Sequence, residues 1–298
     1  MALFLSVLEQ GMIYGILALG VYITYKILDF PDLTVDGSFP FGAAITVRLI
    51  TMGVPSIVTL PAAFLGGALV GICTGLIHVK LKVRDLLSGI IMMTALYTIN
   101  LWVAGAGYVA IFNKSNIFDN AVVNSILPAA VGRFKTVIII FVITMAAKYL
   151  LDWYMSTKSG FLLRAVGDND VIVTSLGVDK GLVKIVGLSI ANGLVSLSGC
   201  IYAQQQRSFE ISIGTGAVVI GLASVIIGTS IFKKVTFFRV TSSVIIGSLL
   251  YKACVALAMF AGIDANAIKL ITAVLFLIIL IVSMDRNTKK SKMKEQGQ

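Results

Sequence analysis

The sequence predicts an all-α integral membrane protein, a polytopic bundle of about 9–10 transmembrane helices. Composition is the first reason: of 298 residues, 58% are hydrophobic and only 13% are charged, and the mean hydropathy is +0.98, unlike a soluble domain. The second reason is that apolar runs near the ~20 residues that a helix needs to cross a bilayer recur from end to end. These runs are continuous, whereas barrel strands would alternate over about 10 residues, so helices are predicted.

Nine apolar runs are predicted to span the membrane. The first has no basic residues before it and no small-residue cleavage pattern, so we assign it as a span and not as a cleaved signal peptide. No soluble domain fits between the runs, and residues 1–284 are therefore taken as a single transmembrane domain. The runs in chain order are 3–25, 39–52, 57–78, 86–105, 134–151, 182–203, 213–232, 240–260 and 267–284.

The second run, 39–52, is short for a bilayer and follows a segment rich in helix breakers and carboxylates. Pro31 and Pro40 each lack a backbone donor and restrict the residue before them, which predicts a broken or re-entrant element and would add one span. Non-helical backbone at membrane depth must be covered by protein or line a water-filled cavity, so the segment is predicted to lie beside a translocation path. The alternative is that its aspartates are solvated loop or helix-capping groups. The candidate path residues are Asp29, Phe30, Pro31, Asp32, Asp36 and Ser38.

Glycines recur every four residues in the third run, at Gly67, Gly71 and Gly75. This small-xxx-small pattern lets two helices approach closely. We predict that the partner helix lies within the chain, with a contact between subunits as the alternative.

Lys252 lies near the middle of the run 240–260, which holds no acidic residue. An ionisable residue inside a membrane is costly and often marks a transport path, so Lys252 is also a candidate path residue. A lysine can instead extend its ammonium group to the interface, and this alternative stays open. Intramembrane charges that relay ions or protons would make the chain a secondary transporter or channel.

Basic residues fall mainly on one alternating set of connections, and arginine and lysine concentrate on cytoplasmic loops. This set includes 80–84, 158–184, 233–239 and the tail 285–298, which we therefore place in the cytoplasm. The tail is a basic segment expected near anionic membrane lipid. Because the basic residues lie between apolar runs and not on a soluble face, nucleic acid is not expected as a partner.

The sequence carries no recognisable catalytic signature. No GxxxxGK[ST] motif occurs, so the chain has no P-loop and any ATP-driven work needs another subunit. His78 is the only histidine, which leaves no triad, and with the dispersed Cys73, Cys200 and Cys254 it matches no metal site. The chain is therefore not expected to be an enzyme, to hold a metal or to bind a cofactor itself.

The longest polar connection, 152–181, is too polar to span the membrane. Within it, 164–176 is predicted to form one short amphipathic helix, broken near Gly167 and stopped by Gly177, a residue suited to the left-handed position after a helix. Such a helix can dock a soluble partner. The alternative is an interfacial helix that covers the inner ends of the spans.

The segment GFLLRAVGDNDVIVTSLGVDKG and the span after it resemble the coupling-loop region of permease subunits of bacterial ATP-binding cassette (ABC) importers of the branched-chain amino acid and ribose type. The N-terminal segment GILALGVYITYKILDFPDLTVDGSFPFGA resembles the first-span region of the same family. Its part FPDLTVDGSF is richer in proline and aspartate than the usual family turn and is similar to the subgroup associated with aromatic amino acid (tryptophan or tyrosine) uptake. The matching positions in the coupling-loop segment and the span after it are Gly160, Arg164, Ala165, Asp168, Asn169, Leu176, Gly177 and Gly199.

This resemblance implies a permease subunit of a bacterial plasma membrane, with a cytoplasmic C-terminus, that moves an amino acid. It implies a second permease subunit, in a homodimer or heterodimer, and an extracytoplasmic solute-binding protein. It also implies two ABC ATPase subunits that bind ATP and Mg²⁺ and drive a cytoplasmic coupling helix. The coupling residues would be Gly160, Arg164, Ala165, Gly167, Asp168, Asn169, Leu176 and Gly177.

Overall fold

The computed structural model describes residues 2–120, 134–175, 177–232, 239–260, 270, 273–274, 276–278 and 281. Within these residues the protein is almost entirely helical, and seven helices are long and apolar enough to cross a membrane. The predicted all-α membrane fold is therefore confirmed. Outside the described residues lie Leu176, the tail 285–298 and most of the predicted run 267–284.

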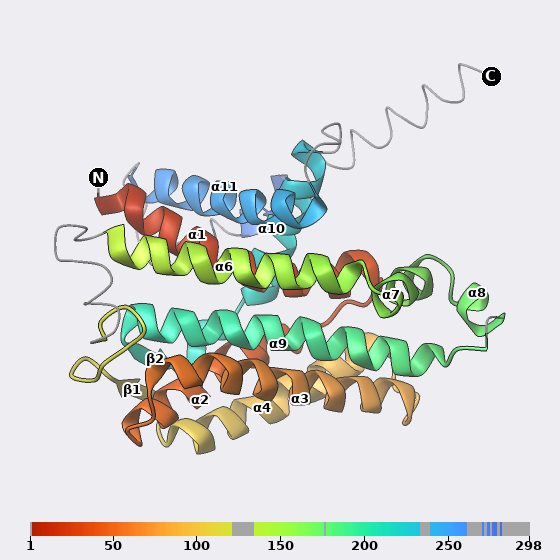
Figure 1. Ribbon diagram of the computed structural model, residues 1–298, viewed down its shortest axis with the longest axis horizontal. Helices are drawn as coiled ribbons and strands as arrows, with labels where there is room; N and C mark the ends of the chain where they lie inside the picture. Colours follow the sequence, from red (N-terminus) through yellow and green to blue (C-terminus); the bar gives the residue numbers. More distant parts are fainter. Residues whose placement is uncertain are drawn as a thin grey trace.

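Most of the long helices run side by side along the longest axis of the molecule (Figure 1). Their bounds lie within a few residues of the predicted runs, because each run is limited by polar residues, glycine or proline. A π-helix, η1 (Tyr22–Ile27), extends the first helix, and a 3-10 helix, η2 (Ser56–Val58), precedes the third. The long helices are α1 (Ala2–Val21), α2 (Val35–Thr51), α3 (Thr59–Val79), α4 (Asp85–Ala104), α6 (Phe134–Met155), α9 (Lys180–Gln206), α10 (Ala217–Ile231) and α11 (Val240–Phe260).

Small elements lie at the two ends of the bundle (Figure 1). At one end, β1 (Tyr108–Ala110) pairs antiparallel with β2 (Ser208–Glu210), and a 3-10 helix, η4 (Ile211–Gly214), follows β2. At the other end, α7 (Lys158–Asp168) and α8 (Asp170–Ser175) lie between α6 and α9. The chain segment predicted to dock a partner is therefore at the end opposite the small sheet.

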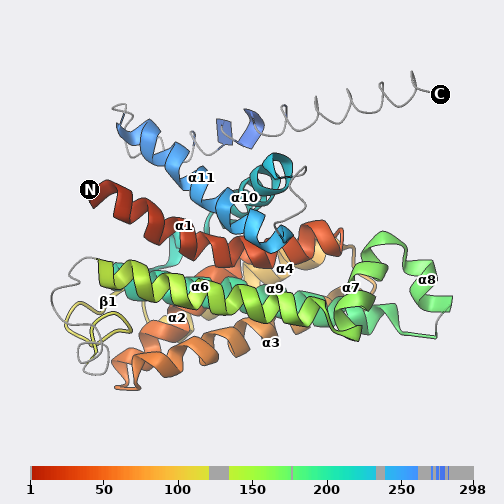
Figure 2. The ribbon, with the colours of Figure 1, turned by 45° about the horizontal axis from the view of Figure 1, so that its top comes forward.

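Helix α9 is the centre of the fold. Helices α1, α2 and α3 all pack against it. In the most apolar 18-residue stretch of α9, 72% of the residues are buried, whereas the corresponding share is 28% in α4 and in α6. Helices α10 and α11 lie on one side of α1, while α2 and α3 lie on the other (Figure 2). Helix α9 is thus mainly enclosed by protein, whereas α4 and α6 keep most of their apolar surface for lipid or for another subunit.

The close approach of α3 to α9 depends on the predicted glycine pattern. A Cβ atom at Gly67 would overlap Ser196, and one at Gly71 would overlap the carbonyl group of Leu188. A Cβ atom at Gly75 would lie 2.9 Å from the side chain of Ile185. Because all three contacts are made by α9, the prediction that these glycines serve a contact within the chain is confirmed.

The broken element predicted around Pro31 and Pro40 is present, but it ends before Pro40. The non-helical segment is 28–34, and α2 then runs unbroken through Pro40. Proline lacks the amide that would bond to the carbonyl of Asp36, and the backbone of Gly214 lies against both that carbonyl and the proline ring. The helix therefore tolerates Pro40 at a place where η4 packs closely on it.

Candidate functional site

Three polar side chains from distant parts of the chain form a buried cluster, which we call the Asp32 cluster: Asp32, Ser38 and Asn192. The amide of Asn192 donates to Oδ2 of Asp32 (2.8 Å), and Oγ of Ser38 donates to Oδ1 of Asn192 (2.6 Å). The backbone N–H of Thr34 donates to Oδ1 of Asp32 (2.9 Å). All three side chains are at most 4% exposed. The cluster ties the non-helical segment 28–34 and the start of α2 to the middle of α9.

Asn192 and the amide of Thr34 together satisfy the buried carboxylate of Asp32. A buried polar group without a partner costs free energy, and a buried charge costs more. Both oxygens of Asp32 accept a hydrogen bond, and the side-chain amide of Asn192 also donates to the carbonyl of Leu188 (3.1 Å). The sequence reasoning missed Asn192. Its only signal was a carboxamide side chain near the middle of the predicted span 182–203.

Asp36 lies beside the Asp32 cluster in sequence but serves another helix. Its carboxylate accepts hydrogen bonds from the backbone amides of Gly216 (3.0 Å) and Val218 (2.8 Å), at the start of α10. A carboxylate at this position satisfies free amides and complements the positive end of the helix dipole. Asp36 thus joins α2 to α10. Of the aspartates Asp29, Asp32 and Asp36, it is the one that caps a helix, which was the alternative to a place on the translocation path.

The other candidate path residues of this segment lie apart from these contacts. Asp29 and Pro31 are exposed, and Asp29 has a positive φ of 50°. Phe30 is buried, and its ring meets that of His78 edge to face at 5.1 Å between centroids. The structure therefore brings Asp32 and Ser38 together through Asn192 but leaves Asp29 and Pro31 at the surface.

Lys252 lies in α11 and contacts neutral groups of α1. Its Nζ is 3.8 Å from the ring centroid of Tyr14 and 3.5 Å from Oε1 of Gln10. No carboxylate among the described residues lies within ion-pair distance of it. The ring of Tyr14 stacks on that of Phe39 (5.6 Å) and meets that of Tyr202 (6.0 Å). Lys252 thus lies beside a group of three aromatic side chains: Tyr14 of α1, Phe39 of α2 and Tyr202 of α9.

The segment predicted as one broken helix at 164–176 is two helices in the structure, α7 and α8, and the break falls at Asn169, two residues after Gly167. Asn169 has extended backbone angles (φ −160°, ψ 104°) between α7 and α8. Gly167 lies inside α7, where a Cβ atom would overlap the carbonyl oxygen of Ile27. Glycine is therefore needed there for close packing of α7 on η1 and not for a break. The left-handed conformation predicted for Gly177 is confirmed, with φ of 74°.

Helix α7 has a buried face and an exposed face. Leu163 and Val166 are buried, and Gly160 packs against the backbone of Tyr154 and Met155. The N-cap is Thr157, whose side chain accepts from the amide of Gly160 (3.3 Å). Of the predicted coupling residues, Arg164, Asp168 and Asn169 are exposed, Ala165 is half-buried, and Leu176 lies outside the described residues. The exposed polar face is available to a partner.

A charged cluster that the sequence reasoning missed lies in the last turns of α6, just before α7. Asp152 accepts from Nζ of Lys148 (2.9 Å) and from Oγ1 of Thr241 (2.6 Å), and it lies 3.4 Å from Arg239. Asp152 and Lys148 are both buried. Their spacing of four residues on one helix was a readable signal. The cluster joins the end of α6, where the chain enters α7, to the start of α11, the helix that carries Lys252.

Comparison with known proteins gives consistent results. The sequence profile of the family described as "Branched-chain amino acid transport system / permease component" matches residues 3–283. A tyrosine transport system permease protein of Clostridioides difficile is 38% identical over 97% of this chain and 95% of its own length. A ribose import permease protein of Escherichia coli K12 is 25% identical over 75% of this chain and 68% of its own. No solved structure matches the chain.

Proposed function

The chain belongs to the family of branched-chain amino acid transport system permease components, and from this premise we propose that it is the membrane-spanning subunit of an ABC importer that carries an amino acid. The observation that supports this most is the family match, which extends over nearly all of the described helical bundle. The family and the seven apolar helices both indicate a multi-pass protein of the plasma membrane. A secondary transporter or channel, the alternative from the sequence, is not favoured by these relatives.

We propose an aromatic amino acid, such as tyrosine, as the substrate. The support is the 38% identity to a tyrosine transport system permease protein. The aromatic group of Tyr14, Phe39 and Tyr202 beside Lys252 is chemically suited to such a solute, since aromatic rings pack edge to face and an ammonium group attracts a carboxylate. Asp32, Asp36 and Ser38 would then act by fixing the helices around the path, and Lys252 by facing it.

We further propose that the energy comes from two separate ABC ATPase subunits, which bind ATP and Mg²⁺ and contact the exposed face of α7 and α8. Arg164 offers a forked donor there for a carboxylate or carbonyl of the partner. A second permease subunit and an extracytoplasmic solute-binding protein would complete the importer. In this arrangement the α7–α8 end and the C-terminus are cytoplasmic, because most basic connections fall on that side.

Uptake into liposomes tests the proposal. The purified permease is reconstituted with its ATPase and solute-binding protein, and entry of labelled tyrosine is measured with ATP, without ATP and without the ATPase. We expect entry only with all components present, and weak competition by leucine or ribose. Entry driven by a proton gradient without the ATPase would show a secondary transporter, and preference for ribose or leucine would remove the aromatic substrate.

Cysteine labelling tests the orientation. A single cysteine is placed at the exposed Ser159 after Cys73, Cys200 and Cys254 have been replaced. We expect a membrane-impermeant reagent to label it only in inverted vesicles. Labelling in intact cells would reverse the proposed topology.

A further inference from the structure

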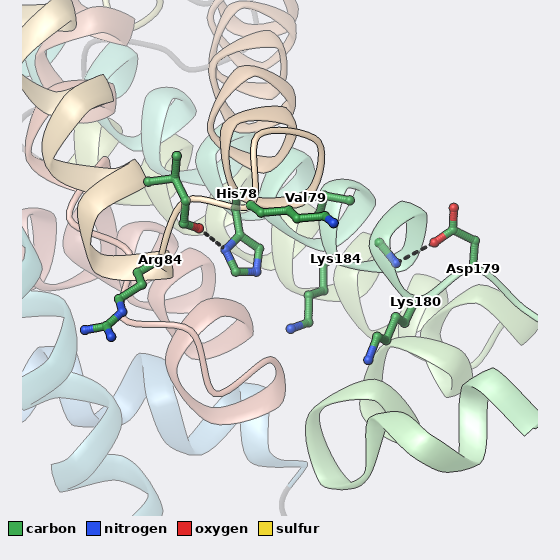
Figure 3. A pocket seen from close by; sticks show the side chains of 9 residues that line it. His78, Val79, Arg84, Asp179, Lys180 and Lys184 are labelled. Carbon is green, nitrogen blue, oxygen red and sulfur yellow. Dashed lines mark hydrogen bonds between the residues drawn. The ribbon is translucent and has the colours of Figure 1, made fainter.

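A pocket of about 480 Å³ lies at the α7–α8 end of the bundle, between the linker that joins α3 to α4 and the first turns of α9 (Figure 3). We call it the basic pocket, because four cationic side chains line it: Lys82 and Arg84 from the linker, and Lys180 and Lys184 from α9. None of the features assigned to transport or coupling above uses these residues.

Three of the four cations of the basic pocket have no ion-pair partner among the described residues. Its one acidic residue, Asp179, is engaged with the start of α9, where Oδ1 accepts from the amide of Gly181 (2.8 Å) (Figure 3). Lys82, Arg84 and Lys184 make no ion pair with any described residue. Helices α4 and α9 both begin here, and the positive ends of their dipoles add to the field. The pocket therefore favours an anion.

The linker is held in the shape that lines the pocket. Nδ1–H of His78 donates to the carbonyl oxygen of Val83 (2.9 Å), which fastens the linker to the end of α3 (Figure 3). Lys82 has a positive φ of 55°, a conformation that L-residues rarely adopt. Both features place basic side chains at the pocket without help from a ligand.

The surroundings of the pocket indicate where the anion comes from. The helices that form it, α3, α4 and α9, are candidate membrane spans, so their ends lie at the depth of lipid headgroups. Leu81, Leu86 and Leu87, next to the basic residues in sequence, are 70%, 44% and 49% exposed. Basic residues with exposed leucines on either side suit a molecule with an anionic head and an apolar tail.

We infer that the basic pocket binds a phosphate group, with the headgroup of an anionic phospholipid as the source that the exposed leucines favour. Arginine can bind two phosphate oxygens at once, and lysine supplies compact point charges. Basic pockets at the ends of transmembrane helices are recognised headgroup sites. Because the pocket spans the linker and the start of α9, a bound headgroup would hold α3, α4 and α9 together next to α8.

Lipid binding to the intact permease tests this inference. The full chain in detergent is titrated with phosphatidylglycerol and, separately, with phosphatidylcholine, and bound lipid is counted by native mass spectrometry. We expect preference for phosphatidylglycerol, and we expect Lys82→Gln and Lys184→Gln each to lower its affinity about fivefold. Lys80→Gln is the matched control, because Lys80 is an exposed cation of the same linker that does not line the pocket.

Inorganic phosphate separates the two sources. Failure of phosphate to displace phosphatidylglycerol supports the lipid headgroup, whereas displacement that depends on Lys82 and Lys184 supports a free phosphate ligand in the same pocket. Equal binding of both lipids, or equal loss in the control and pocket variants, would overturn the inference. So would variants that bind lipid normally but lose the ATPase subunit, since the pocket would then be a protein contact.

Discussion

Asp32 and Asp168 occupy contrasting regions of the same chain. Asp32 is 4% exposed and fully hydrogen-bonded within the Asp32 cluster, whereas Asp168 lies on the exposed face of α7. The sequence predicted a function for both, Asp32 beside the translocation path and Asp168 in coupling to the ATPase. The structure indicates that polar groups around 32–38 join helices to one another, while those of α7 remain available to a partner. Substitutions in the first region should therefore act mainly on stability, and those in the second mainly on coupling.

The largest loss of stability is expected from Asn192→Leu. The variant leaves Oδ2 of Asp32 and the hydroxyl of Ser38 buried without a partner, while Oδ1 of Asp32 keeps the amide of Thr34; the expected cost is about 3 kcal/mol. Thermal unfolding of the purified permease measures the change. Ser189→Ala on the same helix is the control. An unfolding temperature like that of the wild type would show that the Asp32 cluster contributes little to the fold.

Gly167→Ala is expected to cost about 1–3 kcal/mol, because the added methyl group overlaps the carbonyl of Ile27 and α7 must move away from η1. Gly177→Ala is the comparison. It has open space but a positive φ, so roughly 1 kcal/mol is expected from the backbone alone. The same unfolding assay ranks the two. A larger loss at Gly177 would contradict the close-packing role given to Gly167.

Asp36→Asn is expected to lower stability by about 1 kcal/mol, since the amide group that replaces one oxygen cannot accept from the start of α10. Asp29→Asn changes an exposed carboxylate without a described helix end to cap, so no measurable change is expected there. Hydrogen exchange at the first turn of α10 reports the difference directly. Equal exchange in both variants would remove the capping role of Asp36.

Arg164→Ala should have the smallest effect on stability, within about 0.5 kcal/mol, because the side chain is exposed. Its effect on coupling should be larger: loss of a charge-assisted hydrogen bond to the proposed ATPase partner would lower substrate-stimulated ATP hydrolysis about tenfold. Lys158→Ala, an exposed cation at the start of α7, is the control. If hydrolysis stays normal in Arg164→Ala, α7 is an interfacial cover and not a coupling element.

The sequence by itself determined the fold class, the approximate bounds of the described spans and two local features, the left-handed Gly177 and the glycine face of α3. These follow from properties that act on each segment separately. A bilayer selects a helix by the length and hydrophobicity of that one segment, and a residue such as glycine sets its own backbone conformation.

The tertiary structure decided which polar groups meet. Asp32 finds Asn192 in α9, Asp36 caps α10, and Gly167 serves a contact with Ile27 where the sequence suggested a break. Each of these depends on a partner far away in the chain. Inside an apolar bundle a hydrogen bond forms only with the group that helix packing brings within about 3 Å. Local composition cannot supply that partner, because packing is a property of the whole set of helices.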